Sequence, residues 1–191
     1  MMKAGSGAPA PRGKLPDRFV GAWERRELLV DGAPVADAGR VIWVQTNDAY
    51  VDVRGPGSFA SDTAFGGTTT WEPPHLTWLH AFDRLGDGEG VDRGQIDFDG
   101  DDLIESGGFI AGTAREYTER WCPLGGGEPV VVSPFPGGLA VRVGPHAAAI
   151  VDRRPSGGGF AARYERLVDG AWQTEIEIDD GALAALPEVS P

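Results

Sequence analysis

Apolar and polar residues alternate in short runs along most of this chain, and Gly, Pro or Asp-Gly separates most runs from the next. Alternation over about four to eight residues is typical of strands that bury one face. Helical periodicity is nearly absent, and only 181–186 could form a short helix. The pattern predicts strands at 19–30, 40–45, 49–54, 63–71, 76–85, 91–98, 102–109, 114–122, 130–133, 139–143, 146–153, 160–168 and 171–178.

The sharpest turn signal is Val168-Asp169-Gly170-Ala171, where an Asp-Gly dipeptide joins two alternating runs. Asp-Gly readily adopts the positive φ angles of a two-residue hairpin. Many short strands with turns between them predict an all-β fold. We expect an antiparallel up-and-down β-barrel of about ten strands, because sequential strands with short links can close without an exposed edge. A sandwich or two smaller sheets are the alternatives.

Composition favours one folded domain. The chain has 191 residues and 41% hydrophobic residues, enough for a real core, and its 29 Gly and 15 Pro fit a fold with many turns. Residues 1–16 are rich in Ala, Gly and Pro, which predicts a disordered N-terminal segment. We expect the barrel domain to span 17–182 and a C-terminal tail to follow at 183–191.

The charge restricts the partners. A net charge of −12 argues against nucleic acid and against anionic membranes as partners. No run of apolar residues is long enough to span a bilayer, and the first residues lack the apolar core of a signal peptide. The expected location is therefore the cytoplasm. Cys122 is the single cysteine, so no internal disulfide can form, and nothing in the sequence indicates an oligomeric state.

Two predicted strands carry an unusual face, on which aromatic rings alternate with titratable groups. Side chains two residues apart share a strand face, and a plain core face would be apolar throughout. Rings beside a His or a Glu therefore suggest the lining of a pocket. The two faces comprise Leu76, Trp78, His80 and Phe82 on one strand and Arg115, Tyr117, Glu119 and Trp121 on the other.

His80 is the most interesting candidate for chemistry, because an imidazole can transfer protons near neutral pH. In a closed barrel Glu119 could point into the same space and orient the ring of His80. The pair could equally satisfy each other within a core, help to bind a ligand, or act as an acid–base pair.

Tyr50, Asp52 and Arg54 share one face of a strand whose other face holds valines. If the valines face inward, this polar trio is solvated. If the trio faces inward, Arg54 could hold an anionic ligand and Asp52 could fix the guanidinium.

Other polar residues suggest no separate site. Glu105 is expected to pair with an arginine, and His75 and His146 are expected to be exposed at strand starts. Three histidines at unrelated spacings do not form a zinc motif, and no phosphate-binding loop or nucleophile elbow occurs. We therefore expect neither a metal nor a cofactor. The acidic run at 97–102 is expected to be a hairpin turn, because it lacks the closing Glu of a calcium loop.

Phe19-Val20-Gly21-Ala22-Trp23 opens the first predicted strand. This Gly-x-Trp resembles the start of lipocalin-like (calycin) barrels, and the sequence is similar to uncharacterised intracellular bacterial members of that superfamily. The resemblance implies that the indole of Trp23 lies across the closed end and that a basic side chain from the last strands, here Arg166, covers it. The Thr-Asp-Tyr-like turn of lipocalins is missing, and Glu24 and Arg25 replace the glycine of haem-binding relatives.

These observations predict a barrel that binds a small hydrophobic, aromatic or amphipathic molecule in its cavity. A second hypothesis is a cofactor-independent isomerase, cyclase or lyase with His80 and Glu119 as catalytic residues. A third is a barrel with a solid core that binds another protein through its outer surface. The predicted ligand-binding residues are Trp43, Arg54, Trp78, His80, Phe82, Tyr117, Glu119 and Trp121.

Overall fold

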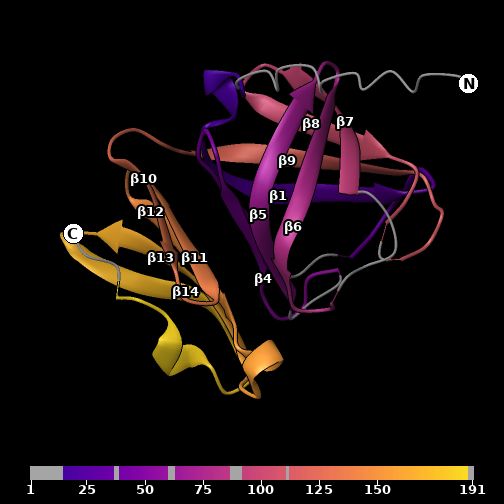
Figure 1. Ribbon diagram of the computed structural model, residues 1–191. Coiled ribbons are helices and arrows are strands. Elements are labelled where there is room, and N and C mark those ends of the chain that lie inside the picture. Colours follow the sequence, from indigo (N-terminus) through magenta and orange to yellow (C-terminus); the bar gives the residue numbers. More distant parts are fainter. Residues whose placement is uncertain (1–14, 37–38, 60–62, 87–91, 111, 189–191) are drawn as a thin grey trace, which may run out of the picture.

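A computed structural model describes residues 15–36, 39–59, 63–86, 92–110 and 112–188. These residues form a closed barrel and a second, separate sheet that lies against one side of it (Figure 1). The chain builds the barrel first and the second sheet afterwards.

Eight antiparallel strands form the barrel, in the order in which they occur in the chain. The last of them pairs with the first, and this pairing closes the ring. A short strand, β2 (Ala33–Pro34), pairs with the end of the first strand outside the ring. The barrel strands are β1 (Gly21–Val30), β3 (Val41–Gln45), β4 (Tyr50–Arg54), β5 (Thr63–Glu72), β6 (His75–Asp83), β7 (Asp92–Asp99), β8 (Asp102–Gly107) and β9 (Tyr117–Gly125).

The expected fold class, an all-β up-and-down antiparallel barrel, is confirmed. The barrel closes with eight strands and not with about ten. Once β9 pairs with β1, the ring offers the later strands no free edge, so these pair with one another instead. They form a five-stranded antiparallel sheet of β10 (Val130–Phe135), β11 (Gly138–Val143), β12 (His146–Asp152), β13 (Phe160–Val168) and β14 (Ala171–Asp179).

The two sheets bury a shared hydrophobic core. Outward-facing side chains of β3 and β4, such as Ile42 and Val51, pack against inward-facing side chains of the second sheet, such as Val141 and Ile150. Consequently both faces of β3 are buried along its whole length, and β4 is buried up to Arg54. This explains why β3 reads as a nearly continuous apolar run.

The barrel interior holds a second core that is dominated by rings. A short 3-10 helix, η1 (Asp17–Phe19), places Phe19 at one end of the barrel, 5.0 Å from the ring of Trp71 and 5.4 Å from that of Phe98. The indole Nε1 of Trp23 donates to the carbonyl of Phe19 at 2.9 Å. One barrel end is therefore plugged by the segment that precedes β1.

Outside the strands, the other short helices are η2 (Arg154–Ser156) and η3 (Leu183–Ala185). Ala182 and Leu186 are buried against the second sheet, so part of the expected C-terminal tail belongs to the folded structure. Of the expected disordered segment, residues 1–14 lie outside the described residues, and Leu15 is buried in the barrel core. No helix within the described ranges is long and apolar enough to cross a membrane.

The turn signals correspond to real turns. Asp169 and Gly170 have φ angles of 50° and 82°, and Val168 pairs with Ala171 across them. The acidic run forms the expected hairpin, in which Asp99 pairs with Asp102. The dipeptides therefore fix strand ends through their left-handed backbone, as their residue types predict.

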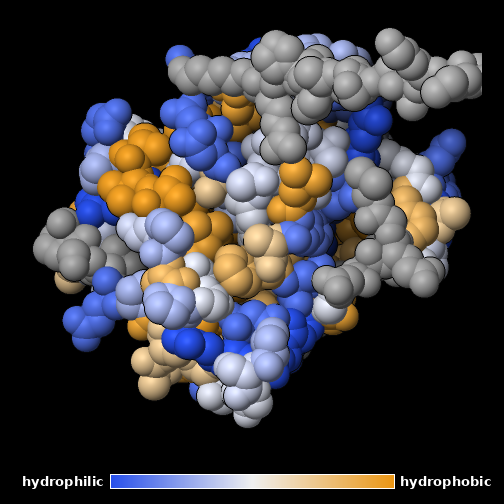
Figure 2. All heavy atoms as spheres, in the orientation of Figure 1, coloured by the Kyte–Doolittle hydropathy of each residue, from blue (hydrophilic) through white to orange (hydrophobic). Residues whose placement is uncertain are grey.

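Strand β10 is an edge strand of the second sheet and is exposed over most of its length. Figure 2 shows a hydrophobic patch over this strand, and Val131 and Val132 are its exposed large side chains. Pro134 removes one donor from this edge, which limits its capacity to pair with another strand.

The shared core predicts that the barrel and the second sheet stabilise each other. Ile42→Ala, which removes a fully buried contact to the second sheet, should lower the free energy of unfolding by about 2–5 kcal/mol. Val131→Ala, an exposed matched control, should change it by less than about 0.5 kcal/mol. Urea unfolding of the original protein and of the two variants measures these changes in the free energy of unfolding. Equal stability of both variants would show that the two sheets do not pack together in solution.

Candidate functional site

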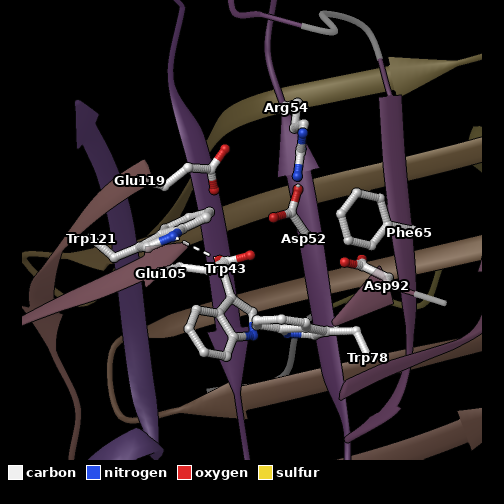
Figure 3. A pocket seen from close by; sticks show the side chains of 9 residues that line it. All are labelled: Trp43, Asp52, Arg54, Phe65, Trp78, Asp92, Glu105, Glu119 and Trp121. Atoms are coloured by element: carbon white, nitrogen blue, oxygen red, sulfur yellow. Dashed lines mark hydrogen bonds and ion pairs between the residues drawn. The ribbon is translucent and has the colours of Figure 1, made fainter. Parts of the chain in front are cut away.

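A small, partly open cavity lies inside the barrel, beside the indole rings of Trp43, Trp78 and Trp121 (Figure 3). Its volume is about 30 Å³. That is room for only a few small atoms, far below the roughly 300–1,000 Å³ of pockets for drug-sized ligands. The side chains that line it are Trp43, Asp52, Arg54, Phe65, Trp78, Asp92, Glu105, Glu119 and Trp121.

Indole rings form the floor of the cavity. Trp43 is central, and the rings of Trp78 and Trp121 each lie 5.7 Å from it in edge-on arrangements of 69° and 73°. Trp23 stacks beneath Trp43 at 6.1 Å. The Nε1 of Trp43 donates to Gln45 Oε1 at 3.1 Å, which fixes the orientation of the central ring. The floor is therefore rigid and apolar, with π faces available to a ligand.

Above this floor, Asp52 and Arg54 project inward from β4, while the valines beside them face the second sheet. Arg54 Nε donates to Asp52 Oδ1 at 3.0 Å, and its guanidinium lies 4.9 Å from the ring centre of Phe65. Burial raises the pKa of Asp52, although Arg54 opposes the shift. Burial lowers the pKa of Arg54, but Asp52 and Glu119 raise it overall, so the guanidinium stays charged.

A second ion pair joins β1 and β9, the two neighbouring strands whose pairing closes the barrel. Arg25 Nη1 donates to Glu119 Oε1 at 2.7 Å, and both side chains are almost inaccessible to solvent. Arg25 also donates to the backbone carbonyl of Phe59 at 3.4 Å. Glu119 therefore reaches the cavity, as expected, but its partner is an arginine.

Glu105 on β8 is the most unusual group in the cavity. It accepts hydrogen bonds from Tyr117 Oη at 2.7 Å and from Trp121 Nε1 at 3.2 Å. Burial, together with the charges of Glu119 and Asp92, raises the pKa of Glu105 well above its usual range. The expected arginine partner is absent from these contacts, so the expectation for Glu105 was wrong.

Two glycines make space for this arrangement. A Cβ at Gly94 would lie 2.6 Å from Glu105 Cγ, and a Cβ at Gly107 would lie 2.5 Å from the ring of Tyr117. Both glycines sit on strands next to the group that they accommodate. Because each larger residue would collide with a buried polar side chain, the two glycines are part of how the sequence builds the site.

His80 lies at the rim and does not pair with Glu119. Its Nδ1 is 2.8 Å from Asp83 Oδ2, its Nε2 is 2.8 Å from Asp92 Oδ2, and its ring stacks on Phe65 at 4.5 Å. Burial lowers the pKa of His80, but the two carboxylates raise it to about 9, so the imidazole is protonated at neutral pH. The expected His80–Glu119 pair thus does not form, because Glu119 pairs with Arg25 and His80 with Asp92.

Phe82 does not face the cavity, because a bulge interrupts β6. Gly67 pairs with His80, the extra residue Ala81 follows, and Phe82 then packs against the core between the two sheets. A Cβ at Gly67 would lie 2.0 Å from the carbonyl of Leu79, so the bulge requires glycine there. The strict alternation that we expected from 76 to 82 is broken at this point.

Two buried hydroxyls near the cavity have no hydrogen-bond partner within the described part of the chain: Tyr50 Oη and Thr63 Oγ1. Both residues lie on the inward faces of their strands, because Tyr50 alternates with Asp52 and Thr63 pairs with Arg54. Burial, then the charges of Asp92, Asp52 and Asp83, raises the pKa of Tyr50 well above its usual range. Its hydroxyl is therefore neutral and lies close to the carboxyls of the site.

The structure gathers five of the predicted ligand-binding residues directly around the cavity, namely Trp43, Arg54, Trp78, Glu119 and Trp121. Tyr117 donates a hydrogen bond to the cavity-lining Glu105, and His80 lies within hydrogen-bonding distance of the cavity-lining Asp92. Phe82 packs in the core between the two sheets. Sequence reasoning assigned no site role to Phe65 or Asp92 and expected Glu105 to be structural. The signal that could have found Glu105 is its position between two inward-facing residues, Leu103 and Gly107, of one strand.

The predicted contact between Arg166 and Trp23 does not form. Arg166 belongs to β13 of the second sheet and donates to Glu175 at 2.7 Å, whereas Trp23 lies inside the barrel. The expectation assumed that β13 closes the barrel, and β9 closes it instead.

A wider groove, of about 490 Å³, lies between the barrel and the second sheet. Its arginines are engaged by carboxylates: Glu24 pairs with Arg26 and Arg40, and Glu175 with Arg40 and Arg166. His146, which we expected to be exposed, is buried in this region with its Nδ1 2.8 Å from Tyr164 Oη. Strand β12 is covered on both faces, which explains the burial.

No cluster of three or more potential metal ligands occurs among the residues that the structure describes. The sequence matches no protein-family model, and comparison with curated proteins and with solved structures gave no significant match. The site is therefore interpreted from its own geometry.

The position of His80 predicts a pH-dependent stability. Its folded pKa of about 9 lies above the roughly 6.5 of an unfolded histidine, so the charged ring stabilises the fold fully below about pH 6.5, and this contribution is lost as the pH rises through about 9. His80→Gln should remove that loss from the profile of unfolding free energy against pH. His75→Gln, at the opposite end of β6, serves as the control. An unchanged profile in His80→Gln would refute the assignment.

Proposed function

We propose that the barrel cavity binds a small molecule, or the small polar head of a larger one. The remainder of a larger ligand would extend through the open side of the cavity. The indole floor supplies apolar contact area, and the carboxyls and arginines above it orient the ligand.

One observation supports this proposal above the others: the barrel buries several ionisable groups where a structural core would be apolar. Asp52, Glu105 and Glu119 are all buried inside the barrel. Replacing buried ion pairs by packed apolar residues is often neutral or stabilising, so a stable core alone does not require these groups. Buried groups with shifted pKa values around a cavity are typical of functional sites.

The size of the cavity restricts the range of ligands that we expected from the sequence. A whole aromatic ring system would not be enclosed without displacement of the indoles, because the cavity measures only about 30 Å³. The proposal therefore concerns a compact polar group that contacts the indoles and not a large aromatic body.

Proton transfer is a second candidate function, favoured by one contact. Glu105, whose pKa burial raises well above its usual range, contacts Tyr117 Oη and would serve as a general acid, and Glu119, which pairs with Arg25, lies opposite it on the neighbouring strand. In this hypothesis Glu105 takes the role that the sequence suggested for His80.

We also propose that the barrel is a lipocalin-like member of the calycin superfamily and that the protein works in the cytoplasm. The Gly-x-Trp at the start of β1 and the inward position of Trp23 support the first point. The presence of only one cysteine in 191 residues is compatible with the second.

The proposed binding is tested with two phenylalanines on neighbouring strands. Phe65 lines the cavity, whereas Phe82 packs between the two sheets. Phe65→Leu should weaken ligand binding at least about fivefold, because an aromatic contact is worth roughly 1 kcal/mol. Phe82→Leu should leave binding unchanged. Calorimetric titration with the ligand found by native mass spectrometry of the protein, or with hits from a panel of compounds of up to about ten heavy atoms, measures the affinities.

Both variants should remain folded, which circular dichroism and thermal unfolding can verify. Equal weakening by Phe65→Leu and Phe82→Leu would place the ligand outside the barrel. Failure of every compound in the panel to bind, with no ligand retained by the purified protein, would refute a binding function for the cavity.

A further inference from the structure

We propose that the ligand of the cavity is a small organic cation, held through an ammonium or amidinium group between the indole floor and the surrounding carboxyls. This inference rests on the proposed binding function and specifies its chemistry. It is carried by the charge balance of the site, by the aromatic floor and by two unpartnered buried hydroxyls.

The charge balance favours a cation. Among the residues that the structure describes, five carboxyl groups surround the cavity and its rim, against three basic groups. Both arginines already donate to carboxylates, and His80 lies between two of the acids. With every group ionised the site would carry an excess of two negative charges. The acids are Asp52, Asp83, Asp92, Glu105 and Glu119, and the bases are Arg25, Arg54 and His80.

The aromatic floor adds a second attraction. Figure 3 shows the carboxyls of Asp52 and Glu105 pointing into the space above the indole of Trp43. A cation in that space would contact the face of an indole and two carboxyls together. Tryptophan is the side chain that attracts cations most strongly through its ring, and desolvation strengthens this attraction.

The unpartnered hydroxyls supply an independent observation. Tyr50 is fully buried, and its Oη has no partner among the described residues, although its neighbours include cavity-lining Asp52 and Asp92. Thr63 Oγ1 is likewise buried beside Arg54. Buried hydroxyls without a partner are costly, and each can accept a hydrogen bond from an N–H of the ligand.

An anion fits this site less well. It would have to displace Asp52 from Arg54 or Glu119 from Arg25, leaving a buried carboxylate without its counter-charge. A neutral ligand would bring no positive charge to balance the excess of carboxyl groups over basic groups in the site. The absence of a metal-type cluster among the described residues directs the inference to an organic cation, which needs no fixed coordination geometry.

Cation binding should be linked to the ionisation of Glu105. The groups that face Glu105 are Tyr117, Glu119 and Trp121 from β9, Asp92 from β7, and Asp52 and Arg54 from β4. Burial and the acids among them raise the pKa of Glu105 well above its usual range, which favours its protonated form in the free protein. A bound cation reverses this preference, so binding should release a proton.

The test uses three probes of almost identical shape and different charge: acetamidinium, acetamide and acetate. Isothermal titration at constant ionic strength near pH 7 should show acetamidinium binding at least about tenfold more tightly than either of the others. Repeating the titration in buffers of different ionisation enthalpy should reveal the released proton.

Glu105→Gln keeps the shape of the side chain but removes its charge. It should weaken acetamidinium binding at least about tenfold and abolish the proton release. The matched control is Glu165→Gln, because Glu165 is also a buried glutamate but lies on β13 of the second sheet, where it pairs with Arg163. This control should bind like the original protein.

Each outcome decides a separate question. Equal or tighter binding of acetate or acetamide would overturn the cation inference and leave the binding function in place. The same conclusion follows if acetamidinium fails while a compound of the wider panel binds at the cavity. Unchanged affinity in Glu105→Gln would show that the cation binds elsewhere. If neither these probes nor the panel binds, the proposed function itself is refuted.

Discussion

The pairing of β9 with β1 is the constraint on which the rest of the structure depends. It closes the ring after eight strands, and an eight-stranded barrel has an interior just wide enough for side chains to fill. Closure brings together residues far apart in the chain: Arg25 meets Glu119, and Trp43 meets Trp121. It also leaves the later strands without an edge to join. The second sheet and the converging polar groups are thus two consequences of one pairing.

The second sheet holds the site in place from behind. Because β3 and β4 are covered by the second sheet on their outer faces, the strands that carry Trp43 and Asp52 cannot move independently of the core. Rigid strands place side chains more precisely than loops do. The rim is less enclosed, since His80 lies directly before the bulge residue of β6 and keeps 24% of its side chain exposed. Burial therefore decreases from the indole floor toward the rim.

The sequence predicted what depends on local pattern. Strand positions, the Asp-Gly turns and the mixed aromatic and polar faces follow from residue type and spacing, and they are present in the structure. It could not predict where the ring closes, because the choice between β9 and a later strand rests on contacts between distant residues. For the same reason it missed the partners of Glu105 and His80. Phe82 was misplaced because one extra residue, Ala81, reverses the alternation of β6.

Gly94 and Gly107 leave the space that the polar side chains of Glu105 and Tyr117 occupy in the barrel interior. An apolar side chain at Gly94 or Gly107 would fill space and bury more area, but it would displace Glu105 or Tyr117. Glycine in a strand interior lowers stability through chain entropy and lost packing. Burying Glu105 costs further stability, because desolvation and its acidic neighbours oppose its charge. Both costs act at the same place. Under the proposed cation binding, a positively charged ligand would offset the second cost only when bound, so it would stabilise the folded protein.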